Sequence, residues 1–257
     1  MISGVAALVL LAFVLLLWLV SVAIRNVSIV DIFWGPGFAL VAWVIVAQRD
    51  WALTAGQWLL VALVSAWALR LGGYLAARNL GKGEDYRYAA MRSRIGPRFV
   101  WVSAFTVFGL QGALIWVVAL PIQAALLQAQ SATIGLLGWL GVAIWATGLT
   151  FEALGDAQLA RFKADPTNAG KVMDRGLWRY TRHPNYFGDF LIWWGHFALA
   201  LALGAPWWTV LSPAIMTFLL TRVSGVPMLE AALSKRRIGY DEYVRRTSAF
   251  FPRPPKP

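Results

Sequence analysis

The chain has 257 residues, of which 59% are hydrophobic and 14% charged, and its mean hydropathy is +0.61. This composition leaves too little polar surface to cover a water-soluble globule, so it excludes an ordinary soluble domain. The lack of cysteine excludes disulfides and thiolate metal sites, and two histidines are too few for a typical zinc site, so no metal is expected. The net charge of +11 fits cytoplasmic loops beside anionic lipids better than it fits nucleic acid, which is not expected as a partner.

Apolar segments recur along the chain, and most are long enough to cross a hydrocarbon core of about 30 Å. No cationic stretch precedes the first of them, which indicates a retained helix and not a cleaved signal peptide. We expect an all-α integral membrane protein with about seven transmembrane helices and, because no long linker divides it, a single membrane domain over residues 1–257. The predicted spans are 4–24, 29–48, 53–76, 99–123, 133–154, 187–204 and 207–222, followed by a tail over 223–257.

The connections between these segments alternate in charge. Every Lys and Arg except Arg49 lies in or beside the first, third or fifth connection, or in the tail. The connections around residues 128–131 and 204–206 carry none. Because positive residues accumulate on the cytoplasmic side, the pattern predicts an outside N-terminus and a cytoplasmic C-terminus.

Polar side chains in or beside the spans gather near the predicted cytoplasmic level, where each is a functional candidate. They are Asp31, Arg70, Tyr74, Glu152, Asp156, Asn185, Asp189 and Arg222. Their convergence predicts a polar cavity open to the cytosol. The long stems of Arg70 and Arg222 would also let them reach water by snorkelling. Gln111 lies deeper, where it can contact a substrate or hydrogen-bond a neighbouring helix.

The densest polar run extends from Arg179 to Asp189 and joins a cationic loop to the next predicted span. Pro184 suits the first position of a helix, and the free N–H groups at a helix start favour an anion such as phosphate. Arg179 and Arg182 can bind that anion through paired donors. Asn185 offers an amide to a base edge, and Asp189 can accept hydrogen bonds from sugar hydroxyls. The run therefore predicts a site for a nucleotide-like molecule.

The run from Arg182 to Asp189 resembles the C-terminal signature of the steroid 5α-reductase and sterol-reductase superfamily. The whole chain resembles the bacterial membrane family known as DUF1295, which is assigned to that superfamily. The other matching stretches are 31–35, 84–88, 156–158, 162–163, 176–178, 240–243 and 247–252. The resemblance implies a multi-pass protein of the bacterial inner (cytoplasmic) membrane, surrounded by membrane lipids.

The superfamily implies NADPH-dependent reduction of a carbon–carbon double bond in a steroid-like or other apolar lipid. The cofactor pocket would open to the cytosol, and the lipid would enter from the bilayer. The implied cofactor-binding residues are Lys163, Arg179, Arg182, His183, Asn185, Tyr186, Asp189, Glu230, Tyr240 and Tyr243. At Leu159 the chain lacks a second cation that sterol reductases carry, which leaves the choice between NADPH and NADH open.

The catalytic residues implied by the resemblance are Asp31 and Tyr74. The 5α-reductases use a Gln-Glu pair and a Tyr, and this chain has no such Gln-Glu pair, so a 3-oxo-4-ene steroid is not established as the substrate. A carboxylic acid and a phenol at similar depth would polarise an enone oxygen and help to protonate the product. The nicotinamide would supply the hydride. Trp34 and Gln111 are candidate substrate residues, although Trp34 also suits packing or anchoring at the interface.

The main alternative is an S-adenosylmethionine-dependent membrane methyltransferase resembling isoprenylcysteine carboxyl methyltransferase. The residues that fit its Arg-His-Pro-x-Tyr-x-Gly core and late acidic tail are Arg182, His183, Pro184, Tyr186, Gly188 and Glu230. Asn185 and Asp189 together favour the reductases. A transporter is less favoured, because the polar groups lie at one face of the membrane and no inverted repeat is found. The sequence leaves the lipid, the proton donor, the stereochemistry and the oligomeric state open.

Overall fold

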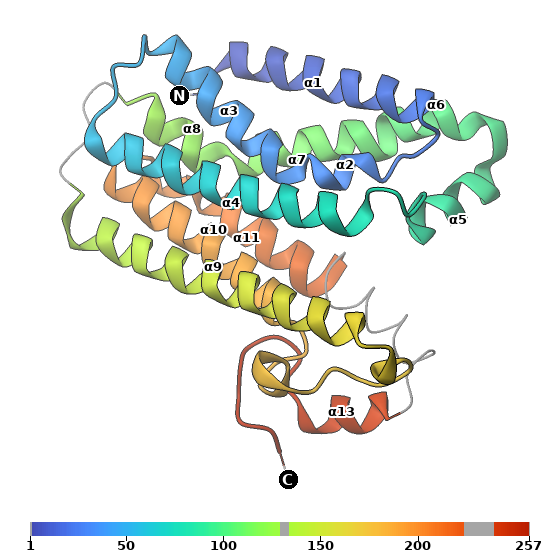
Figure 1. The fold of residues 1–257 in the computed structure, drawn as a ribbon. Helices are drawn as coiled ribbons and strands as arrows, with labels where there is room; N and C mark the ends of the chain where they lie inside the picture. Colours follow the sequence, from blue (N-terminus) through green and yellow to red (C-terminus); the bar gives the residue numbers. More distant parts are fainter. Residues whose placement is uncertain (1, 129–133, 224–238, 257) are drawn as a thin grey trace. The chain divides into compact units, whose positions relative to one another are not determined.

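The computed structural model describes residues 2–128, 134–223 and 239–256, and its regular secondary structure there is entirely helical (Figure 1). The chain divides into two compact units. The first comprises Met1–Gly135 with Ala200–Thr209, and the second comprises Leu136–Leu199 with Val210–Pro257.

The first unit consists of helices that begin and end at recognisable sequence signals. Its helices are α1 (Gly4–Ala23), α2 (Ile29–Ile32), α3 (Trp34–Gln48), α4 (Ala55–Asn79), α5 (Tyr86–Ile95), η1 (Gly96–Arg98), α6 (Phe99–Ser103), the π-helical η2 (Ala104–Gly109), α7 (Leu110–Val118) and α8 (Leu120–Leu126). Ser3 caps α1, because its hydroxyl accepts a hydrogen bond from the amide of Ala6 at 3.0 Å. Thr54 and Gln57 form a capping box before α4.

The core of the first unit is built around the hairpin of α3 and α4. A Cβ added to Gly35 would lie 3.1 Å from the carbonyl oxygen of Ala68, so the two helices approach closely at this point. Phe38 and Trp67 are completely buried, with their ring centroids 5.7 Å apart in an edge-on arrangement. Gln57 extends the core to α8, because its amide nitrogen donates to the carbonyl oxygen of Ala125 at 2.9 Å.

The described residues of the second unit form two long helices, two shorter ones and several single turns. They are α9 (Gly135–Ala164), η3 (Pro166–Asn168), η4 (Gly176–Arg179), α10 (Pro184–Ala202), α11 (Leu211–Phe218), the π-helical η6 (Leu219–Val223) and α13 (Tyr240–Arg246). The turn η5 (Trp207–Val210) precedes α11. The first residue of α9, Gly135, and the last three residues of α10, 200–202, belong to the first unit.

Glycines bring α9 and α10 together almost backbone to backbone. On α9 they recur every seven residues, at Gly141, Gly148 and Gly155, and on α10 at Gly188 and Gly195. A Cβ on Gly148 would lie 2.6 Å from the carbonyl oxygen of Gly188, and a Cβ on Gly195 would lie 2.7 Å from that of Gly141. Gly155 faces the first turn of α10. The two helices are therefore antiparallel, and their contact fixes the end of α9 against the start of α10.

The prediction of an all-α membrane protein is confirmed, because the described elements are helices and several of them can span a bilayer. Among the described residues, four helical stretches are long and apolar enough to do so: Gly4–Ala23, Ala55–Asn79, Tyr86–Val118 and Gly135–Ala164. The helix Trp34–Gln48 is apolar but shorter. The described parts of the three other predicted ranges, 29–48, 187–204 and 207–222, are also largely helical.

Two predicted spans are interrupted, and proline accounts for both breaks. The predicted span 29–48 divides at Phe33, because Pro36 has no N–H to bond to the carbonyl oxygen of Ile32 one turn earlier. The predicted span 99–123 contains a π-helical turn and breaks at Ala119, just before Pro121 in the first turn of α8. Pro184 begins α10, as the sequence predicts.

Candidate functional site

The second unit carries an open cavity of about 870 Å³ between residues 169–179 and the C-terminal residues. Among the described residues of its wall, six carry a charge: four cations and two carboxylates. The cations are Lys171, Arg175, Arg179 and Arg246, and the carboxylates are Asp174 and Glu242. This surplus of positive charge favours an anionic ligand.

One wall of the cavity is the loop after α9, which returns to that helix through defined contacts. The side-chain oxygen of Gln158 accepts a hydrogen bond from the amide of Leu177 at 3.0 Å. Gly176 has a φ of +59° and lies so close to Gln158 that an added Cβ would be 2.6 Å from this oxygen. The buried indole of Trp178 donates to the carbonyl oxygen of Gly155 at 3.0 Å. These contacts hold the cationic loop against α9.

The other wall is formed by residues 239–256, which we call the C-terminal segment. In Figure 1 it includes α13 and lies beside the loop that follows α9. Hydrogen bonds join it to residues 178–182. The Tyr243 hydroxyl donates to the Trp178 carbonyl, and Nη1 of Arg182 donates to the carbonyls of Val244 (2.8 Å) and Thr247 (2.9 Å). Three further bonds run from Arg182 N to Ser248 O (2.9 Å), from Thr181 Oγ1 to Phe250 O (2.8 Å) and from Arg253 N to Tyr180 O (3.0 Å).

The predicted cofactor-binding residues occupy several different environments. Arg179 and Tyr243 come together on the cavity wall. Tyr240 is buried, with its ring 6.0 Å from that of Tyr243. Lys163 is exposed in the last turn of α9. Glu230 lies outside the described residues.

Arg182 is buried and holds the C-terminal segment. Its side chain is 8% exposed, and Nη1 donates to two carbonyls in and after the last turn of α13. A cation is favourable at this end of a helix, where carbonyl groups lack partners. The structure therefore separates Arg182 from Arg179, which is exposed on the cavity wall, although the sequence assigns both to phosphate binding.

The other predicted cofactor residues lie at the contact between α9 and α10. His183 is buried, and its ring stacks on Tyr186 with 5.5 Å between centroids. The amide of Asn185 donates to Oδ1 of Asp156, which is 4% exposed, at 3.1 Å. Asp189 is half-buried one turn further along α10. None of these side chains belongs to the cavity wall among the residues that the structure describes, so they form a second polar group in the same unit.

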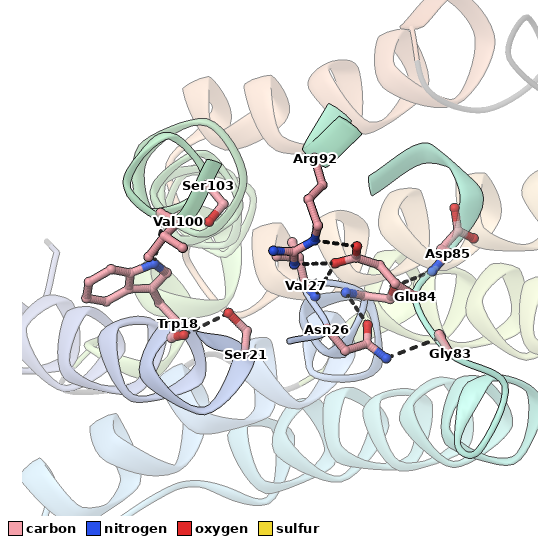
Figure 2. A network of polar contacts seen from close by, with 11 residues as sticks. Trp18, Ser21, Asn26, Val27, Gly83, Glu84, Asp85, Arg92, Val100 and Ser103 are labelled. Atoms are coloured by element: carbon pink, nitrogen blue, oxygen red, sulfur yellow. Dashed lines mark hydrogen bonds and ion pairs between the residues drawn. The ribbon is translucent and has the colours of Figure 1, made fainter. Parts of the chain in front are cut away.

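A polar network in the first unit joins the connection after α1 to the start of α5 (Figure 2). The carboxylate of Glu84 accepts from Nε and Nη2 of Arg92, each at 2.8 Å, and from the amide of Val27 at 2.8 Å. The side chain of Asn26 donates to the carbonyl of Gly83 at 3.2 Å. This network fixes the loop before α5 against the loop before α2.

Asp31, one of the two predicted catalytic residues, extends this polar region. Its Oδ2 is ion-paired with Arg87 at 2.8 Å, and its Oδ1 accepts a hydrogen bond from the Tyr88 hydroxyl at 2.8 Å. Arg87 also pairs with Asp85 at 2.8 Å. The sequence marked residues 84–88 only as a matching stretch. The signal that could have indicated this arrangement is a lone carboxylate in a predicted span together with the adjacent Arg87 and Tyr88.

The remaining predicted residues of the first unit lie apart from these carboxylate contacts. The ring of Tyr74 contacts the guanidinium groups of Arg70 and Arg78. Their Cζ atoms lie 5.4 Å and 5.7 Å, respectively, from the ring centroid. Trp34 packs edge-on against Phe38 at 5.2 Å. Gln111 is half-buried on α7. The roles predicted for Tyr74, Trp34 and Gln111 stay predictions.

The Glu84 contacts predict a defined pH dependence. Hydrogen bonds from Arg92 lower the pKa of Glu84 below its ordinary value of 4.5, and burial opposes this only in part. The stability that the carboxylate contributes is then fully present above about pH 4.5 and is lost as the pH falls through the lowered pKa.

We expect the Glu84→Gln variant to lose about 2 kcal/mol of folding stability at pH 7. Its difference from wild type should shrink in thermal unfolding below pH 4.5. Asp241→Asn, at an exposed carboxylate, is the control; a difference independent of pH would contradict the assignment.

The fold and cavity define an all-helical membrane protein with a basic ligand-sized cavity. The family model described as protein of unknown function (DUF1295) matches residues 17–247, so the chain belongs to this family, as the sequence motifs predict. The uncharacterized protein C594.04c of Schizosaccharomyces pombe is 28% identical over 215 residues, covering 72% of this chain and 61% of that protein. The chain thus matches less than two thirds of the relative's length. No solved structure matches the chain.

Proposed function

We propose that this protein is an NADPH-dependent membrane reductase of a carbon–carbon double bond in a steroid-like or other lipid. The observation that carries the proposal is the cavity with four cations on its wall. Nicotinamide dinucleotides carry a pyrophosphate, and NADPH carries one further phosphate. Arginine binds such groups through paired, charge-assisted hydrogen bonds. The volume of about 870 Å³ also lies in the range of roughly 300–1,000 Å³ that is usual for small-molecule sites.

The same charges make a methyltransferase the second candidate. S-adenosylmethionine carries a sulfonium, an ammonium and one carboxylate, so it is not an anion overall. A wall of Lys171, Arg175, Arg179 and Arg246 would repel the sulfonium more than Asp174 and Glu242 attract it. The motif shared with the methyltransferases still fits this chain, so S-adenosylmethionine remains the alternative cofactor to test.

Each unit contributes its own proposed groups, which are phosphate-binding cations in the second unit and a catalytic pair in the first. Arg175 and Arg179 would hold the phosphates, and the bound cofactor would supply a hydride. Asp31 and Tyr74 are the proposed groups that polarise the lipid and protonate the product, a role that requires Asp31 to carry a proton during the reaction, unlike the carboxylate that pairs with Arg87. Asp31 is held between Arg87 and Tyr88 at 2.8 Å each, which supports a fixed position for this carboxylate.

The proposal includes a membrane orientation. The apolar segments support seven proposed spans, and the distribution of Lys and Arg supports an outside N-terminus and a cytoplasmic C-terminus. In a bacterial inner membrane this orientation would open the cavity to the cytosol, where NADPH is available, while the apolar substrate would enter from the lipid phase.

Calorimetric titration of detergent-purified protein with NADPH, NADH and S-adenosylmethionine tests the cofactor assignment. We expect NADPH to bind, and Arg179→Ala to weaken it about tenfold or more, because a charge-assisted hydrogen bond is worth about 1.5–3 kcal/mol. Arg161→Ala is the matched control, since Arg161 is an exposed arginine of α9 that does not line the cavity. Equal NADPH affinity in the two variants, or binding of S-adenosylmethionine alone, would overturn the proposal.

A further inference from the structure

The C-terminal segment supplies a large part of the cavity wall. Its contribution consists of Gly239, Glu242, Tyr243, Arg246, Thr247 and Pro255. The rest of the wall comes from residues 169–179, which precede the C-terminal segment by about 60 positions in the chain. The cavity is therefore complete only while the C-terminal segment is docked on its own unit.

Docking depends on two sets of contacts. Arg182 and its neighbours bind the backbone of the segment, as described above. Beyond them, Phe250 and Phe251 pack against α10: the ring of Phe190 lies 5.6 Å from Phe250 and 5.8 Å from Phe251, and Phe187 lies 6.1 Å from Phe250. Phe250 is 7% exposed. Aromatic contacts of this kind contribute stabilisation beyond that of the apolar area that they bury, so this cluster anchors the segment.

Arg246 is the one cation that the segment contributes to the described wall. Its Nη1 lies 3.5 Å from Oε1 of Glu242 one turn earlier, and the two side chains are 53% and 62% exposed. Exposed ion pairs of this type contribute little stability, so Arg246 can exchange Glu242 for another anion at small cost. The backbone at Arg246 is fixed, because its carbonyl accepts a hydrogen bond from the amide of Lys256 at 2.9 Å.

We propose that Arg246 binds a phosphate group of the cavity's ligand, and that this contact locks the C-terminal segment in its docked position. Arg246 lines the same cavity as Arg175 and Arg179, so the three guanidinium groups can contribute to one phosphate site. Because the two events are then linked, any change that undocks the C-terminal segment must also lower the affinity of the cavity for its ligand. The inference rests on the proposed function in so far as the ligand is a phosphate-bearing cofactor.

Two measurements on the full chain test the inference: affinity for NADPH and for inorganic pyrophosphate, and hydrogen exchange of residues 240–256. Arg245→Ala is the matched control for Arg246→Ala, because Arg245 is the adjacent exposed arginine and does not line the cavity. We expect Arg246→Ala to weaken binding about tenfold, Arg246→Lys to restore part of it, and Arg245→Ala to leave it unchanged. Ligand should slow exchange over 240–256 in wild type, and this slowing should be lost in Arg246→Ala. Phe250→Ala should weaken binding although Phe250 does not line the cavity.

The outcomes separate the two proposals. If both ligands bind equally well to the Arg246→Ala and Arg245→Ala variants, the Arg246 inference is wrong while the cofactor site stands. If pyrophosphate binds in an Arg246-dependent way and NADPH does not bind, the phosphate site stands and the reductase proposal falls. If wild type binds neither, both are overturned.

Discussion

Gly188→Ala is expected to destabilise the second unit by about 3 kcal/mol or more, the upper range for overpacking. A Cβ at this position would lie 2.5 Å from the amide nitrogen of Glu152 and 2.5 Å from the carbonyl oxygen of Gly148. Both are backbone atoms of α9, which cannot move aside as a flexible side chain would. The helices would have to separate, and the hydrogen bond between Asn185 and Asp156 would be strained as well.

Gly73→Ala is the control for this substitution. Gly73 also lies in a long helix, α4, but an added Cβ there meets nothing within 4 Å. Alanine is favoured over glycine in a helix by about 1 kcal/mol, so this variant should be neutral or slightly stabilised. Thermal unfolding in detergent, followed by helical circular dichroism, compares the two. If the Gly188→Ala and Gly73→Ala variants have the same melting temperature, the close packing of α9 on α10 is wrong.

Arg182→Ala is expected to lower stability by about 3 kcal/mol and to weaken cofactor binding indirectly. The substitution leaves the carbonyls of Val244 and Thr247 without their charged donor and opens a cavity at a buried position. The C-terminal segment should then exchange amide hydrogens faster even without ligand. Arg179→Ala, by contrast, should weaken binding without lowering the melting temperature, because Arg179 is exposed on the cavity wall.

The pair distinguishes a structural arginine from a ligand-binding one. If Arg182→Ala keeps the wild-type melting temperature and exchange rates but loses the cofactor, Arg182 contacts the phosphate directly, as its motif predicts. That result would contradict the structural role derived from its two carbonyl contacts.

The helices were largely predictable from sequence because apolar length and proline position act locally. Residues 4–24 closely match α1, and Pro184 begins α10 as expected. The break at Phe33 was missed, because the apolar composition of 29–48 outweighed the missing N–H of Pro36 in the prediction. The glycines of α9 recur visibly in the sequence, but their partners on α10 follow only from the antiparallel packing.

The cavity was less predictable, because its wall joins distant and irregular segments. Lys171 and Arg175 lie in a loop without periodicity, and Arg246 lies in a short helix far along the chain, so no spacing relates them. The motif drew attention to residues 179–189, of which Arg179 lines the cavity, yet it could not tell Arg179 from Arg182. That distinction depends on which backbone carbonyls the fold brings to each side chain.

Isotope transfer tests the reductase proposal most directly. Purified protein would be incubated with a bacterial lipid extract and two donors, NADPH deuterated at the transferring position of the nicotinamide and S-adenosylmethionine deuterated on its methyl group. Mass spectrometry of the lipids would follow each label separately. We predict lipids that gain one deuterium from NADPH and one proton from solvent, with the gain reduced in Arg179→Ala when NADPH is below saturation. Deuterated methyl groups in the lipids, with no deuterium from NADPH, would contradict the reductase and identify a methyltransferase.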